Sequence, residues 1–119
     1  MPTLPATGPI ASHFRDRAPN VAATYAVLLR AARALGPVTE EAKKTSIHLV
    51  RESAFAGVAT QKAALILTLK SATDLRSSRI RKHEQASANR WHLEVRLAEP
   101  AEVDAEVKQW LAAAYALAG

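Results

Sequence analysis

The sequence predicts an α+β fold, in which a small antiparallel sheet of about four strands carries an N-terminal and a C-terminal helix on one face. Three observations predict it. Apolar residues recur with a helical period in residues 20–35 and 100–118, they alternate with polar residues in 91–97, and short connections join three apolar segments between 46 and 70. The apolar side of each helix must be buried against another apolar surface, and the Leu-rich face of the strands supplies one.

The first long helix is expected to begin at Asn20, a residue type that caps helix N-termini well. Gly36 and Pro37 end it, because glycine suits the left-handed position after a helix and proline cannot continue one. Residues 11–17 have room for one or two helical turns anchored by Phe14. The apolar stripe of the long helix is Val21, Tyr25, Leu28, Leu29, Ala32 and Leu35.

Four segments are predicted to be strands: 46–51, 55–59, 65–70 and 91–97. The connections between the first three are short, which favours an antiparallel meander. Side chains alternate between the two faces of a strand, so each strand sends its polar residues away from the helices. That second face is expected to carry His48, Ile66, Thr68, Lys70, His92, Glu94 and Arg96.

Residues 71–90 contain one strongly apolar residue between Arg76 and Arg90, Ile80, which is too few for an amphipathic helix. The segment is interpreted as a loop, with the possibility that residues 79–85 pair back across a turn at 87–89.

The C-terminal helix follows. Pro100 fits its first turn, and the acidic Glu102 and Asp104 suit the positive end of the helix dipole. Its expected apolar stripe is Val103, Val107, Trp110, Leu111, Ala114 and Leu117, with Trp110 in the core beside Leu28.

The chain has 119 residues, of which 49% are hydrophobic and 23% charged, and it has no cysteine. This composition indicates one globular domain, over residues 11–119, after a flexible tail of residues 1–10 that is rich in proline. Disulfides, thiol nucleophiles and cysteine-based metal sites are excluded. Without a signal peptide or a membrane-spanning run, a cytoplasmic protein with no membrane partner is expected. A core of small aliphatic residues favours a surface site over a deep cofactor pocket, and no cofactor is expected.

The net charge of +5 is unevenly distributed. Residues 41–96 hold eleven Lys and Arg against five Asp and Glu, whereas the rest of the chain is nearly neutral. Such asymmetry is typical of an anion-binding surface and also of a solvated face. In residues 76–83 the cations alternate near Trp91, a pattern that can hold phosphates and stack a base. The candidate ligand-binding cations are Lys43, Lys44, Arg79, Arg81, Lys82 and Arg90.

His48 and His92 form a second candidate site. Both are expected on the polar face, and if their strands are neighbours they can join Glu94 in a metal or general-base site. Polar side chains on a solvated sheet face are the alternative. No two histidines are three or four residues apart, so no helical metal motif is present. Lys43-Lys44-Thr45 lacks the preceding glycines of a phosphate-binding loop.

Several segments are familiar as a set: 40–47, 55–58, 65–70, 78–84, 87–90 and 94–97, followed by Val103-Asp104 and Trp110-Leu111. Together they span about residues 11–118. They resemble a bacterial domain family of unknown function, numbered five-six-five-five. The resemblance implies the fold outlined above and supplies neither an activity nor a catalytic set.

We therefore expect a small binding or accessory domain without catalysis. Its basic centre is the part expected to meet a partner, which is an anionic ligand, an acidic protein or a nucleic acid. One alternative is a small enzyme or metal site at His48, His92 and Glu94. Another is a structural module that self-associates, and the sequence leaves monomer and homodimer open.

Overall fold

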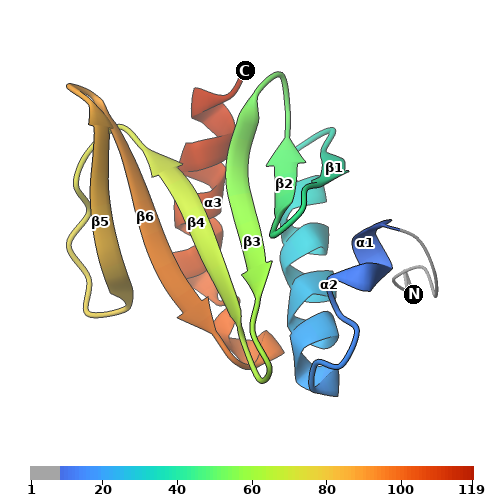
Figure 1. The fold of residues 1–119 in the computed structure, drawn as a ribbon. Coiled ribbons are helices and arrows are strands. Elements are labelled where there is room, and N and C mark those ends of the chain that lie inside the picture. Colours follow the sequence, from blue (N-terminus) through green and yellow to red (C-terminus); the bar gives the residue numbers. More distant parts are fainter. Residues whose placement is uncertain (1–8) are drawn as a thin grey trace.

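A computed structural model describes residues 9–119. Within them, six antiparallel strands form one sheet, with two long helices beside it (Figure 1). The strands, in their order across the sheet, are β1 (Thr39–Ala42), β2 (Ile47–Val50), β3 (Ala54–Thr60), β4 (Leu65–Ser71), β6 (Arg90–Leu97) and β5 (Ile80–Ser87). The helices are α1 (Pro9–Ser12), α2 (Pro19–Arg33), the 3-10 turn η1 (Pro100–Glu102) and α3 (Ala105–Leu117).

The α+β prediction is confirmed, with two more strands than expected. β1 has the sequence Thr-Glu-Glu-Ala, which contains no apolar alternation, so its sequence gave no strand signal. It is a short, charged edge strand of the kind that resists pairing with other chains. The other additional strand is β5. It pairs with β6 across the turn before Arg90, which is the alternative to a loop that was considered for residues 79–85. Of the expected tail, residues 1–8 lie outside the described residues, and Pro9 and Ile10 belong to α1.

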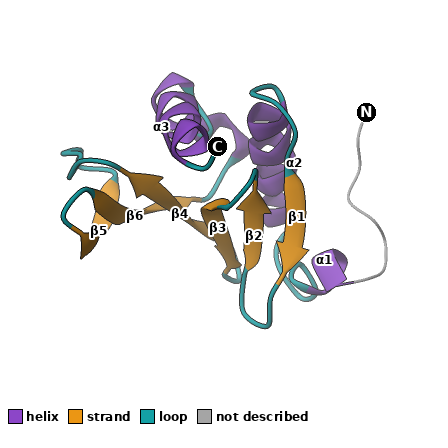
Figure 2. Ribbon diagram, turned by 90° about the horizontal axis from the view of Figure 1, so that it is seen from above, coloured by secondary structure: helices purple, strands orange, loops and turns teal. Residues whose placement is uncertain are grey.

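Both α2 and α3 lie on the same face of the sheet, as predicted (Figure 2). The pairing register explains why, because it sets Ile47 beside Val58, Val58 beside Leu67 and Leu67 beside Val95, an apolar row that crosses four strands. All four side chains are buried. The opposite face, called the outer face here, carries the alternate residues, including His48, Thr68 and Glu94 in a parallel row. The sheet is therefore apolar toward the helices and polar away from them.

The start of α2 differs from the expectation. Ala18 is the N-cap residue, and Asn20 lies inside the first turn, where its side-chain amide donates to the carbonyls of Ala63, at 3.0 Å, and Ala98. Asn20 thus joins the helix to the two connections that follow β3 and β6. At the other end the helix stops at Arg33, which leaves Leu35 outside the stripe and exposed.

Gly36 is required where it stands. Its φ of 149° is in the region that favours glycine, and a Cβ atom there would collide with the hydroxyl of Tyr115. That hydroxyl donates to the carbonyl of Pro37 at 3.0 Å. The chain reversal after α2 is therefore packed directly against α3.

α3 begins after Asp104, whose carboxylate accepts from the Val107 amide, while Pro100 lies in the separate turn η1. Its buried residues are Val107, Leu111, Ala114 and Tyr115. Trp110 is only partly buried, against expectation, because the buried face of the helix is centred on Leu111. No described helix has the length and apolar character needed to cross a bilayer.

Candidate functional site

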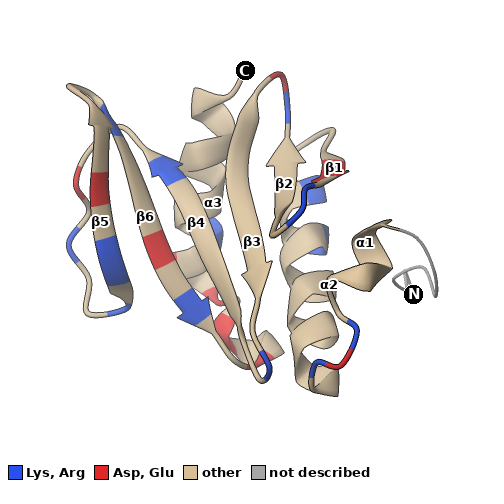
Figure 3. Ribbon diagram, in the orientation of Figure 1, with Lys and Arg blue, Asp and Glu red and all other residues tan. Residues whose placement is uncertain are grey.

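The six candidate cations do not converge. Lys43 and Lys44 lie in the turn between β1 and β2, whereas Arg81 and Lys82 lie on β5, and β1 and β5 are opposite edges of the sheet (Figure 3). Four intervening strands separate the two groups. The basic centre of the sequence is therefore divided between the two edges of the sheet, because the order of strands differs from the order of the sequence.

Arg79 is engaged in the structure itself. Its guanidinium donates to both carboxylate oxygens of Asp104, at 2.9 and 3.0 Å, to Glu106 at 3.2 Å and to the carbonyl of Glu102 at 2.8 Å. Hydrogen bonds from Arg79 and from the Val107 amide hold the pKa of the Asp104 carboxyl below its usual value. Arg79 thus joins the loop before β5 to the N-terminus of α3.

Within residues 9–119, the other three candidate cations at this edge have one acidic neighbour, Glu94. The Lys82 ammonium lies 4.0 Å from the Glu94 carboxylate on β6, and Arg90 donates to the neighbouring carbonyl of Asn89. Arg81 is exposed at a register shift between Ile80 and Lys82. Solvent-accessible cations of this kind, with few contacts, are typical of a solvated face.

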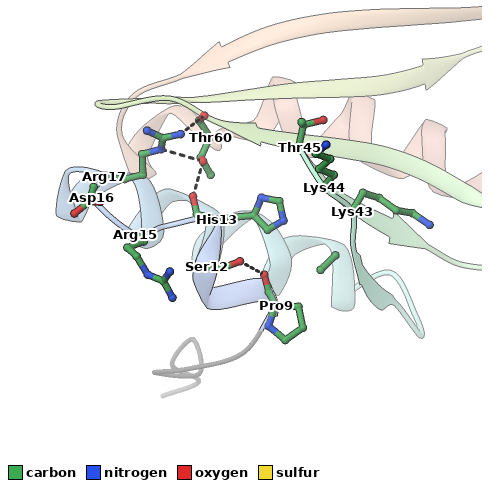
Figure 4. Close-up of a pocket in the computed structure, with 11 residues that line it drawn as sticks. Pro9, Ser12, His13, Arg15, Asp16, Arg17, Lys43, Lys44, Thr45 and Thr60 are labelled. Atoms are coloured by element: carbon green, nitrogen blue, oxygen red, sulfur yellow. Dashed lines mark hydrogen bonds between the residues drawn. The ribbon is translucent and has the colours of Figure 1, made fainter.

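At the other edge, Lys43 and Lys44 lie beside a polar pocket of about 680 Å³, called the edge pocket here. Its second wall is the connection between α1 and α2, which contributes His13, Arg15 and Arg17 (Figure 4). Four Lys and Arg line the pocket against one carboxylate, that of Asp16. The edge pocket is therefore strongly cationic.

Arg17 is held in place by Thr60, at the end of β3 (Figure 4). Its Nε donates to the Thr60 hydroxyl oxygen at 3.1 Å and its Nη2 to the Thr60 carbonyl at 3.4 Å. The same hydroxyl donates to the carbonyl of His13 at 2.5 Å. The Ala18 amide adds a bond to the carbonyl of Lys62 at 2.8 Å. These contacts fix the connection against the sheet.

The cations of the edge pocket differ in how far they are neutralised. Lys43 lies 3.3 Å from the Glu41 carboxylate. Within residues 9–119, no carboxylate oxygen comes within 4.0 Å of the charged nitrogens of Arg15, Arg17 or Lys44. An incoming anion would thus meet three cations that have no acidic partner in the described structure.

Sequence reasoning missed Arg15 and Arg17. They lie outside residues 41–96, and the charges outside that range were summed over both flanks to nearly zero, so the charge count drew attention away from them. Their approach to Lys43 and Lys44 depends on the packing of α1 beside β1. The only local signal was two arginines on either side of one aspartate, a pattern too common to single out.

The metal or general-base site at His48, His92 and Glu94 is not assembled. The two histidines share the outer face and line one hollow, but β3 and β4 lie between their strands. Three strand spacings of about 4.8 Å place the two strands roughly 14 Å apart, and His92 is displaced two residues along β6 from Glu94, the residue in line with His48. His92 instead approaches Glu84, at 3.6 Å, and Glu94 faces Lys82. Among the described residues, no group of three or more His, Asp or Glu side chains is arranged to hold a metal ion.

A contact between a histidine and an aspartate, which the sequence did not suggest, occurs on the helix side of β5. The Nδ1 atom of His83 lies 2.5 Å from the Asp74 carboxylate, which also accepts from Arg76 at 2.7 Å. The three residues tie the loop after β4 to the strand that follows it.

Comparison with known proteins agrees with the resemblance seen in the sequence. No curated protein and no solved structure shows significant similarity to the chain. The sequence profile of one family matches residues 10–118, from the second residue of α1 to the end of α3. Because this match covers nearly the whole chain and all six strands, the protein belongs to the family described as Domain of unknown function (DUF5655).

Proposed function

We propose that this domain is a binding module that holds a phosphate-bearing ligand at the edge pocket. The observation that carries the proposal is that Lys43 and Lys44 line the same pocket as Arg15 and Arg17, which are distant in sequence. The basic segment on β5 and its preceding loop is not part of this site.

The chemistry of the edge pocket suits a phosphate group. A guanidinium presents paired N–H donors that match two phosphate oxygens, and Lys adds a compact positive charge. Arg17 is already oriented by Thr60, so less side-chain freedom is lost when an anion binds. The contacts are to phosphate and not to a base, so we expect weak binding with no sequence preference when the phosphate belongs to a nucleic acid.

The test compares charge reversal at the two edges of the sheet. Binding of a labelled single-stranded oligonucleotide is measured by fluorescence anisotropy at low salt, with inorganic phosphate as competitor. The edge-pocket variant carries Arg15→Glu, Lys43→Glu and Lys44→Glu. The control carries Arg81→Glu, Lys82→Glu and Arg90→Glu, which changes the net charge by the same amount. Thr60 and Arg17 are left intact so that the connection keeps its anchor.

The edge-pocket variant should lose binding, whereas the control should retain most of it. For the wild type, log affinity should fall against log salt with a slope of about −0.7 for each phosphate that is neutralised. Equal losses in the two variants would show that only the net charge matters. Absence of binding to the wild type at low salt would contradict the proposal directly.

A further inference from the structure

The outer face contains a hollow of about 390 Å³ that is separate from the edge pocket. It lies along β3 near the middle of the sheet, on the side opposite α2 and α3. Residues from β2, β4 and β6 form its walls, and the backbone and small side chains of β3 form its floor. Its volume is within the range of sites that bind small molecules.

The hollow exists because β3 carries small residues on this face. Gly57 lies between His48 on β2 and Thr68 on β4 in one cross-strand row, and Ala54 and Ala59 line the floor beyond it. A Cβ atom at Gly57 would lie 3.8 Å from the His48 ring and 4.0 Å from the Thr68 Cβ atom, so the glycine leaves a flat floor between two taller walls. A flat apolar group fits against such a floor.

The polar side chains around the hollow can all donate hydrogen bonds, and one of them, Lys70, only donates. Lys70 and His92 are direct cross-strand partners, and His48 stands on the opposite wall. No carboxylate is part of the lining, and within residues 9–119 no carboxylate oxygen lies within 4.0 Å of the Lys70 ammonium. Outside the lining, the Glu84 carboxylate lies 3.6 Å from His92. The charge of the hollow is thus complementary to an anion.

We infer that the hollow binds a small organic carboxylate with a flat apolar body. The carboxylate accepts from the Lys70 ammonium and from His92, and the apolar body lies over Gly57 against the ring of His48. Lys70 supplies the charge, whereas the missing side chain at Gly57 supplies the space. This site shares no lining residue with the edge pocket, although the two linings adjoin at Thr45 and Ser46 and at Ala59 and Thr60.

The experiment uses sodium benzoate as the probe and follows backbone amide and histidine ring signals by NMR. Acetate has the charge without the flat body, and benzyl alcohol has the body without the charge. Lys70→Met removes the ammonium at nearly constant length. Gly57→Val fills the floor with a residue that strands favour, at a position whose φ is not in the left-handed region. Lys62→Met, in the turn between β3 and β4, is the matched control for Lys70→Met.

Benzoate should give saturable shifts confined to the hollow, and both comparators should bind more weakly. Lys70→Met should weaken benzoate binding about tenfold, as expected for loss of a charge-assisted hydrogen bond, and Lys62→Met should leave it unchanged. Gly57→Val, checked for an unchanged amide spectrum elsewhere, should abolish binding. The edge-pocket variant should still bind benzoate, which separates this site from the proposed function. Shifts that do not saturate, that scatter over the surface, or that are equally weakened by Lys62→Met would overturn the inference.

Discussion

At the scale of single residues, the carboxylate of Asp104 has two roles: it caps a helix and it binds an arginine. It caps α3 through the Val107 amide at 3.2 Å and receives two hydrogen bonds from Arg79. Both interactions favour the ionised form, and they lower the pKa of the carboxyl in the folded state. A group whose folded pKa is depressed stabilises the fold above its unfolded pKa, and this contribution is lost as the pH falls through the folded pKa.

Replacement of Asp104 by Ala should therefore lower the melting temperature at neutral pH, and the deficit should shrink as the pH falls below the ordinary value of 3.8. Asp104→Asn can still cap the helix but loses the ion pair, so it should be less destabilised than the Ala variant. Thermal unfolding from pH 7 to pH 2.5 measures both effects. A deficit that grows on acidification would contradict this role.

Neighbouring residues of α3 differ in burial, and this can be measured. Leu111 is fully buried, so Leu111→Ala should cost about 2–5 kcal/mol of unfolding free energy. Trp110 packs only partly against the core, and Trp110→Ala should cost less, about 1–2 kcal/mol. Urea titrations of the two variants test the orientation of the helix. A larger loss at Trp110 than at Leu111 would mean that the buried face of α3 is rotated.

At the scale of elements, Asn20 is the contact that joins α2 to the sheet. Its amide bonds the carbonyls of Ala63 and Ala98, in the connections that follow β3 and β6. Asn20→Ala would leave both carbonyls without this donor and should cost about 1–3 kcal/mol. Asn89→Ala, in the exposed turn before β6, is the control and should stay within about 0.5 kcal/mol. Equal small effects in denaturant titrations would show that Asn20 contributes no such bond.

At the scale of the whole molecule, the strands differ in whether they pair on one side or on both. β3, β4 and β6 are paired along both sides, whereas β1 and β5 are edges and α1 is a single short turn. Hydrogen exchange should therefore be slowest in β4 and β6, where opening requires global unfolding, and faster in β1 and α1. Amide exchange followed by NMR would reveal the gradient. Protection of β1 equal to that of β4 would mean that the edge does not open on its own.

The order of the strands also decides how the positive charge is displayed. Lys43 and Lys44 lie at one edge and Arg81 and Lys82 at the other, and the latter pair stands beside Glu94. One domain thus presents two chemically different edges, although the sequence between residues 41 and 96 has an excess of basic residues. The edge beside α1 combines cations from two distant segments.

The sequence by itself determined the elements whose signals are local. The period of Val21, Tyr25 and Leu28 predicted α2, and the alternation of Leu93, Val95 and Leu97 predicted both β6 and the face it buries. The membership of the outer face, including His48 and Lys70, followed from the same alternation, because side chains in a strand point to opposite faces in turn. The family resemblance also rested on the sequence alone.

Features that depend on which segments become neighbours were decided only by the tertiary structure. β1 has no apolar pattern and exists because β2 offers it an edge to pair with. His48 and His92 share a face, but two strands, β3 and β4, lie between β2 and β6. Arg17 and Lys44 line one pocket because Thr60 holds the α1–α2 connection against the sheet. Local periodicity reports how a segment divides its side chains between core and solvent, whereas the order of strands is set by packing over the whole chain, and the candidate sites depend on that order.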